Sequence, residues 1–173
     1  MFKKSLIGSS LLAATLLSAG AAHAGGYVGG AVGYTDFPND FDGAASAAVN
    51  GGYRLNEYFA VEAAYLYLGE AEDDAAPIWE AEVTGFNFSA IGIIPVNAQF
   101  EVFGKIGAFM WDVDLSEKGY GDLGSEDGTD LSFGAGAMYH VNQDFSVVAE
   151  FQRFDDVAGG DLNNFSVGAR LNF

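Results

Sequence analysis

The 173-residue sequence contains no cysteine, three prolines, two histidines, and seven lysines and arginines against 24 aspartates and glutamates. The absence of cysteine excludes disulfides and thiolate chemistry, and the net charge of −17 excludes a basic surface that follows nucleic-acid phosphates. Charged residues are only 18% of the chain and apolar residues 50%, so the sequence is too hydrophobic for a disordered acidic chain. Its length is typical of one domain.

The N-terminal residues have the parts of a secretory signal. Two lysines precede an apolar run over residues 6–17, and Ala22-His23-Ala24 forms a small-x-small cleavage site. The run is short for a membrane anchor, and small residues follow it immediately. We therefore expect a signal peptide over residues 1–24, cleaved after Ala24, and a mature domain over residues 25–173.

The mature chain alternates between apolar residues and small or polar residues. No second apolar run of about 18 residues occurs, and 24 glycines disfavour long helices. A period of two predicts β-strands. The pattern predicts eight of them, at about residues 26–35, 43–54, 58–68, 82–95, 99–111, 130–141, 145–154 and 162–173.

The predicted connections are of two kinds. Short polar turns are expected at residues 55–57, 96–98 and 142–144, and long loops at roughly residues 36–42, 69–81, 112–129 and 155–161. Nineteen of the 24 acidic residues fall in the long loops or beside them, and the strands are nearly free of charge. One end of the sheet is therefore expected to be tight and the other long and acidic.

The distribution of apolar side chains indicates the solvent. One parity of the strands is a row of Phe, Tyr, Val, Ile and Leu, and the other is mostly Gly, Ala, Ser and Asn. A water-soluble barrel would carry charge on the outer faces of its strands, so we expect the apolar row to face lipid. Lipid-exposed strands have to close, because no water satisfies an open edge. We therefore predict an all-β fold, an eight-stranded antiparallel up-and-down transmembrane β-barrel in the outer membrane of a Gram-negative cell.

Aromatic residues at the strand ends are expected to form two interfacial girdles. The alternative for these side chains is an ordinary core in a soluble β domain. The residues concerned are Tyr34, Tyr53, Tyr58, Tyr67, Trp79, Trp111, Tyr139 and Phe173.

Five charged residues share the parity predicted to face the barrel interior: Glu62, Glu101, Lys105, Glu150 and Arg170. An isolated ion there is expensive, so pairing or residual water is required. We expect a network of Lys105 and Arg170 with Glu62 and Glu150. It is either a structural core or an ion- or proton-conducting gate, and the narrow bore of eight strands favours the structural core.

Several segments resemble the transmembrane domain of the OmpA family. They are residues 51–69, residues 105–111, Glu150-Phe151-Gln152 and residues 166–173. The resemblance covers nearly all of the mature chain and implies an OmpA-like barrel whose interior ion pairs form a plug or gate, with Glu62 and Glu150 at the matching acidic positions. The sequence departs from the family at Ala31 and Ile91, where inward lysines are expected. Since the chain stops at Phe173, we expect no periplasmic peptidoglycan-binding domain.

The last strand also resembles the signal that the barrel assembly machinery reads, in Ser166, Gly168, Leu171 and Phe173. An edge strand with an apolar outward row is available for pairing before the barrel closes. The expected partners are this machinery and periplasmic chaperones during biogenesis, then outer-membrane lipid and lipopolysaccharide around a monomer. Arg153 has lipid parity near the loop end, where it either meets a lipopolysaccharide phosphate or extends into water.

Residues for catalysis or metal binding are scarce. Lipid A acylases and deacylases of this size need a histidine near the outer rim with serine and a carboxylate. The mature chain has only His140, beside a short turn at the other end, and Asn142 stands where a His-x-Ser pattern has serine. The segment from residue 112 starts like a calcium loop but has Glu117 and Leu123 in place of the required glycine and glutamate. We expect no enzyme, no cofactor and no metal site, although clustered loop acids either bind Ca²⁺ or Mg²⁺ weakly or form a solvated rim.

The predicted function is therefore a structural role in envelope integrity, with acidic loops exposed at the cell surface. Two alternatives stay open. One is a narrow, low-conductance pore for ions or small solutes, and the other is adhesion or host recognition through the loops.

Overall fold

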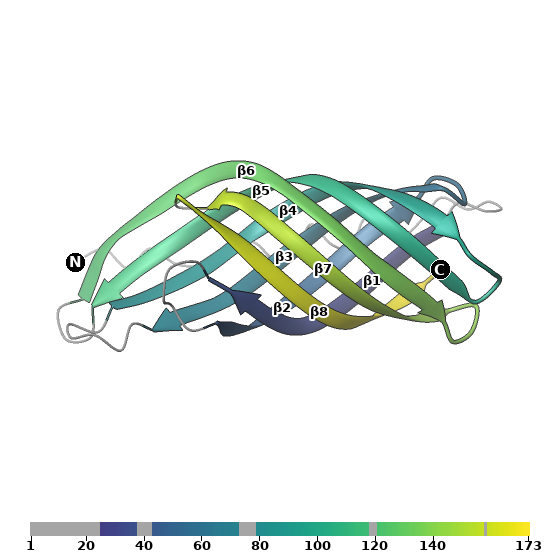
Figure 1. Ribbon diagram of the computed structural model, residues 1–173, viewed down its shortest axis with the longest axis horizontal. Coiled ribbons are helices and arrows are strands. Elements are labelled where there is room, and N and C mark those ends of the chain that lie inside the picture. The colour runs from purple at the N-terminus through teal and green to yellow at the C-terminus, as the bar shows by residue number, and fades with distance from the viewer. Residues whose placement is uncertain (1–24, 38–42, 73–78, 118–120, 158) are drawn as a thin grey trace.

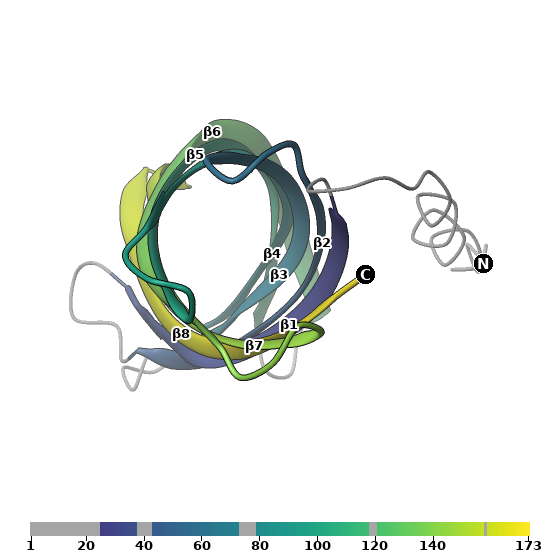
Figure 2. The ribbon, with the colours of Figure 1, turned by 90° about the vertical axis from the view of Figure 1, so that its right-hand side faces the viewer.

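The chain forms a closed antiparallel barrel. The computed structural model describes residues 25–37, 43–72, 79–117, 121–157 and 159–173 (Figure 1). Each strand pairs with the next and β8 pairs with β1, which closes the sheet into the ring seen end-on in Figure 2. The predicted eight-stranded barrel is confirmed. Its strands are β1 (Gly25–Asp36), β2 (Ala44–Arg54), β3 (Phe59–Glu72), β4 (Trp79–Pro95), β5 (Phe100–Glu117), β6 (Gly121–His140), β7 (Phe145–Val157) and β8 (Gly160–Asn172).

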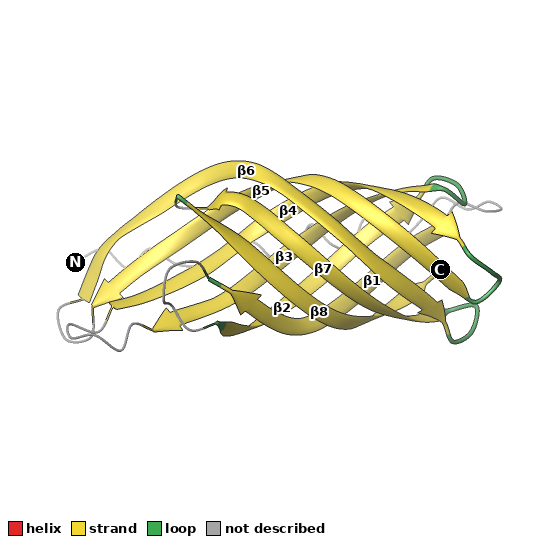
Figure 3. Cartoon of the chain, in the orientation of Figure 1, coloured by secondary structure: helices red, strands yellow, loops and turns green. Residues whose placement is uncertain are grey.

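The described residues are arranged in strands and short connections, with no helix drawn among them (Figure 3). Within the same residues, none forms a helix of the length and hydropathy needed to cross a membrane. The predicted signal peptide, residues 1–24, lies outside the described part of the chain.

Several strands continue further at the loop end than the sequence predicts. β3 and β4 cover most of the loop expected at residues 69–81, and β5 and β6 cover most of that expected at residues 112–129. In Figure 1 the β5–β6 hairpin extends past β7 and β8. Acidic residues suggested loops, but Trp111 and Val113 stay buried while Asp112 between them is exposed, so the period of two persists. Where a strand extends beyond the membrane, its outward side chains contact water, so an outward carboxylate does not prevent strand structure.

The hairpin that joins β7 to β8 is also tighter than predicted. Residues 155–161 are expected to be a loop, yet Val157 pairs with Gly160. Gly159 has a φ of 84° and Asp156 a φ of 56°, a left-handed conformation that aspartate tolerates better than most residues. The backbone N–H of Asp156 donates to the carboxylate of Asp161, which holds this turn.

Three turns at the opposite end share one construction. Each has an asparagine whose side-chain oxygen accepts from two backbone N–H groups further along the turn: Asn56, Asn97 and Asn142. A phenylalanine three residues later begins the next strand, and its carbonyl accepts two backbone N–H groups from the turn. Asparagine favours such turns because its short side chain can mimic a backbone acceptor. The short turns predicted from the sequence are confirmed.

The apolar rows lie on the outer surface. On β8, Phe165, Val167 and Leu171 are exposed, whereas Asn164 and Arg170, which have the opposite parity, are buried. Membrane β-barrels carry apolar side chains outward in this way. The row continues around the barrel at residues such as Val32, Val61, Phe88, Ile106, Leu131 and Val147.

One girdle assignment is wrong. Trp111 is buried inside the barrel, and its Nε1 donates to the Asp130 carboxylate at 2.6 Å. It has inward parity on β5, opposite to the lipid-facing row, so proximity to a strand end was a misleading signal. The side chain of Trp79 lies outside the described residues. The girdle residues exposed at the strand ends are Tyr34, Tyr58, Tyr139 and Phe173, and Tyr53 and Tyr67 are half-buried.

The bore is filled in layers, which the inward residues of β5 mark from the turn end to the loop end. Glu101 lies at the turn end, then Phe103 in an inner apolar layer, then Lys105, then Phe109 and Trp111 in an outer plug. The outer plug consists of Ala64, Leu66, Leu68, Val83, Phe109, Trp111, Val113, Phe154, Val157 and Leu162. The inner apolar layer consists of Tyr27, Ala60, Ile91, Ile93, Phe103, Met138 and Val148. The sequence pattern predicts a mostly small and polar interior and misses these apolar layers.

Two glycines of β4 provide a matched test of this packing. A Cβ on Gly85 would lie 2.4 Å from the Met110 backbone oxygen and 2.5 Å from the Phe109 ring, whereas a Cβ on Gly92 would have nothing within 4 Å. We expect Gly85→Ala to lower the free energy of unfolding by about 1–3 kcal/mol, because the backbone cannot give way cheaply. Gly92→Ala should leave it nearly unchanged. Urea unfolding in lipid vesicles measures both, and equal effects would contradict the packing.

Candidate functional site: the charged barrel interior

Four of the five predicted interior charges lie together between the two apolar layers. In this central cluster (Glu62, Lys105, Glu150 and Arg170), the Lys105 Nζ lies 3.1 Å from Glu62 Oε1 and 2.6 Å from Glu150 Oε1. Arg170 Nη2 lies 2.8 Å from Glu62 Oε2. Two carboxylates therefore balance two cations where little water can solvate them, as a low-dielectric interior requires.

Glu62 is the centre of the cluster. Its carboxylate is almost completely buried and accepts from four side chains, since Tyr27 and Asn50 each donate to Oε2 at 2.9 Å in addition to Lys105 and Arg170. These donors come from four strands, β1, β2, β5 and β8, of which only β2 is paired with β3. One carboxylate thus joins most of the barrel wall across the bore. The roles of Tyr27 and Asn50 are not predictable from the alternation pattern, because both residues are uncharged.

Arg170 is bound less completely than Glu62. Its guanidinium carbon lies 3.9 Å from the centre of the Tyr27 ring, in a cation–π contact. Its Nε is buried and has no hydrogen-bond partner among the described residues. An arginine has five N–H donors, so the hydrogen bond from Nη2 to Glu62 uses only part of the donor capacity of Arg170.

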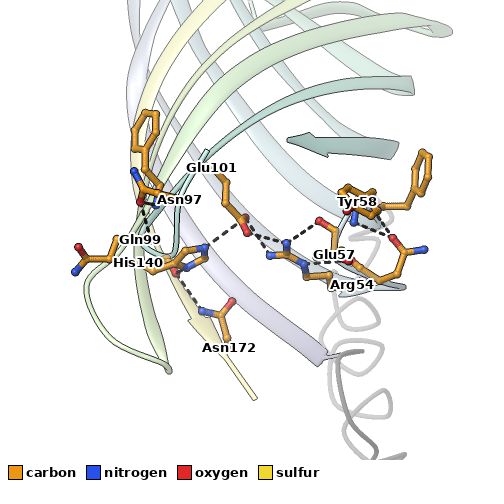
Figure 4. A network of polar contacts seen from close by, with 12 residues as sticks. Arg54, Glu57, Tyr58, Asn97, Gln99, Glu101, His140 and Asn172 are labelled. Atoms are coloured by element: carbon orange, nitrogen blue, oxygen red, sulfur yellow. Dashed lines mark hydrogen bonds and ion pairs between the residues drawn. The ribbon is translucent and has the colours of Figure 1, made fainter. Parts of the chain in front are cut away.

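Glu101 belongs to a second group, not to the central cluster. The mouth network (Arg54, Glu101, His140, Ser146 and Asn172) lies at the turn end of the bore (Figure 4). The Arg54 guanidinium donates two hydrogen bonds, of 2.8 and 3.0 Å, to the Glu101 carboxylate. Such bidentate pairing is a strong geometry for arginine and a carboxylate. The five charges with inward parity therefore form two groups, which the inner apolar layer separates, because Glu101 lies two inward positions from Lys105 on the tilted β5.

His140 links the mouth network across neighbouring strands. Its Nδ1 lies 2.8 Å from Ser146 Oγ and its Nε2 lies 3.3 Å from Glu101 Oε2. Asn172 donates to Ser146 Oγ at 3.1 Å. Both imidazole nitrogens therefore have a hydrogen-bond partner when the Ser146 hydroxyl donates to Nδ1 and Nε2–H donates to Glu101. The His-x-Ser pattern compares residues along one strand and therefore does not include Ser146, which is paired with His140 across a hairpin. His140 and Ser146 lie at equal distances before and after the predicted turn at residues 142–144, and this symmetry could have indicated that they are paired.

The Ser146 hydroxyl is enclosed by its hydrogen-bond partners. The Ser146 residue is 0% exposed, so its hydroxyl is not open to a substrate in this structure. The hydroxyl is also held by Asn172. The arrangement fastens β5, β6, β7 and β8 to one another at the turn end.

The other predicted site residues lie as follows. Ser166 and Gly168 are half-buried on the inward side of β8, and Leu171 and Phe173 are exposed on the outward side. Arg153, at the loop end of β7, is paired with Asp155 and Asp161, so its charge is already balanced within the hairpin. Glu117 and Leu123 of the loop weighed for calcium have side chains outside the described part. Among the side chains that are described, no group of three or more potential metal ligands is found.

The comparisons with known proteins agree with this architecture. Residues 9–173 match the family described as outer membrane protein beta-barrel domain. No curated protein matches the sequence. The structure is similar to neisserial surface protein A, with a TM-score of 0.69, 17% identity and coverage of 90% of this chain and 100% of that one.

Two further structures have the same fold. The N-terminal β-barrel domain of Pseudomonas aeruginosa OprF gives a TM-score of 0.62 at 17% identity, over 86% of this chain and 99% of that one. The attachment invasion locus protein Ail of Yersinia pestis, in complex with the heparin analogue sucrose octasulfate, gives 0.59 at 15% identity, over 87% and 97%. The family match and these neighbours confirm the OmpA-like fold. The chain belongs to the outer membrane protein beta-barrel domain family, and it is an integral β-barrel of the outer membrane.

Proposed function

We propose that this barrel has a structural, non-enzymatic role in the integrity of the outer membrane, with a bore that does not conduct. The supporting observation is the outer plug, in which Leu68, Phe109 and Phe154 are each 0% exposed. The Phe109 and Phe154 rings pack with their centres 4.5 Å apart. An ion on this path would lose its water to an apolar constriction, and such constrictions block conduction.

A conduction measurement tests this proposal against the gated pore. We expect Glu62→Ala and Lys105→Ala barrels, checked for folding by heat-modifiable gel mobility, to conduct no more than the parent in planar bilayers. The reason is that breaking the central cluster leaves the outer plug in place. A clear rise in conductance in either variant would overturn the closed bore and favour a gate formed by the cluster.

Adhesion through the outer hairpins is a second candidate, and the length of the β5–β6 hairpin favours it. The outward Asp112 and Asp127 lie directly opposite each other on this hairpin. Such a surface repels polyanions, so a sulfated ligand like the one bound to Ail is not expected here. Loss of whole-cell binding after deletion of the hairpin tip would support recognition by this surface.

We also propose that β8 carries the segment that the barrel assembly machinery recognises, with periplasmic chaperones acting before it and lipopolysaccharide surrounding the folded monomer. The support is the outward row of β8, which ends in Leu171 and Phe173. We expect deletion of Phe173 to reduce the amount of heat-modifiable barrel in the outer-membrane fraction. Unchanged assembly in the deletion strain would contradict this role.

A further inference from the structure

A pocket of about 400 Å³ opens at the turn end of the barrel, below the inner apolar layer. Its walls include apolar side chains of that layer, Tyr27, Ile93 and Met138, and polar side chains at the mouth such as Asn172 and Asp144. The volume is within the range of small-molecule sites, which combine an apolar lining with a few placed polar groups.

Three charged side chains line this pocket. Arg54, Arg170 and Asp144 line it, whereas Glu62, Glu101, Lys105 and Glu150 do not. Arg54 uses its donors on Glu101 and on the backbone oxygens of Asn56 and Glu57. Arg170 is 5% exposed and has a buried Nε with no partner among the described residues. A buried donor without a partner is costly, and the guanidinium that carries it lines the pocket.

We infer that this pocket binds a small organic carboxylate, with the carboxylate at Arg170 and its apolar part against Tyr27, Ile93 and Met138. Guanidinium groups recognise carboxylates through charge-assisted hydrogen bonds. The apolar walls favour an acid with a short hydrocarbon chain over a fully hydrated anion. This binding goes beyond the structural role proposed above and does not depend on whether the bore conducts.

The test uses sodium butyrate as the probe and the mature barrel in detergent micelles, followed by NMR chemical-shift titration. We expect saturable shifts at Tyr27, Asn172 and the other pocket residues, weaker binding of acetate and no saturable shifts with butylammonium. Arg170→Gln should weaken butyrate binding about tenfold or more, because a hydrogen bond to a charged group is lost. Arg170→Lys, which keeps the charge facing Glu62, should also weaken it because the planar fork is gone.

Arg153→Gln is the matched control, because it removes the same charge at the far end of the barrel and should leave butyrate affinity within about twofold. Equal affinity in the parent and in folded Arg170→Gln would overturn the site. So would shifts confined to lipid-facing residues, which would indicate partition of butyrate into the micelle, and so would the absence of saturable shifts in the parent. If Arg170→Gln does not fold, Arg170→Lys decides by the same criterion.

Discussion

Replacing Glu62 with alanine is expected to lower the free energy of unfolding of the barrel by about 3–5 kcal/mol. The carboxylate accepts hydrogen bonds from Tyr27, Asn50, Lys105 and Arg170, and its removal leaves Arg170 without its carboxylate partner and Lys105 with Glu150 alone. Chemical unfolding in lipid vesicles, followed by tryptophan fluorescence and gel mobility, measures the loss.

Two control variants test whether that loss of stability comes from the broken central cluster. Glu57→Ala removes an exposed carboxylate in a turn and should change stability by less than about 0.5 kcal/mol. Replacing all four members of the central cluster with leucine or methionine should restore most of the stability, because apolar side chains of similar volume often replace buried ion pairs without loss. A Glu62→Ala barrel as stable as the parent would show that the cluster contributes little to the fold.

Placing an arginine at Ile106 is expected to destabilise the barrel by about 2–4 kcal/mol in a bilayer. Ile106 is an outward residue near the middle of the membrane-crossing part of β5 and is 52% exposed on the outer surface. In a water-soluble barrel the same substitution at an exposed position would be nearly neutral. The prediction therefore tests directly whether the apolar row faces lipid.

Val96→Arg is the comparison for this experiment. Val96 is also exposed and apolar, but it lies in a turn at the end of the barrel, where an arginine costs only about 0–1 kcal/mol. Unfolding of both variants in vesicles gives the difference. If the two arginines lower the free energy of unfolding by similar amounts, Ile106 does not lie deeper in the membrane than Val96.

The fold was predictable because its main signals are local. Alternation on a strand such as β8 distinguishes the outward Phe165 and Val167 from the inward Asn164 and Arg170, and a turn asparagine such as Asn142 marks where the chain reverses. Strand ends beyond the membrane were harder to predict. Asp112 and its neighbours have the composition of a loop, and their strand structure depends also on pairing with β4 residues such as Thr84, which are distant along the chain.

The site was predictable only in part, because parity identifies which residues point inward but not the height at which they meet. Glu62, Lys105, Glu150 and Arg170 converge because strand tilt and register bring them to one level. The same tilt takes Glu101 to the mouth, where it meets Arg54. Register between neighbouring strands, which one sequence does not supply, would have been needed to predict the division.

The order of the layers gives the two ends of the bore different access. Fully buried apolar side chains fill it near the loop end, whereas the pocket beside Arg170 opens at the turn end, which faces the periplasm in barrels of this kind. A molecule held in that pocket would exchange with a single compartment. Compounds added outside an intact cell should therefore reach the pocket only after they have crossed the outer membrane by another route.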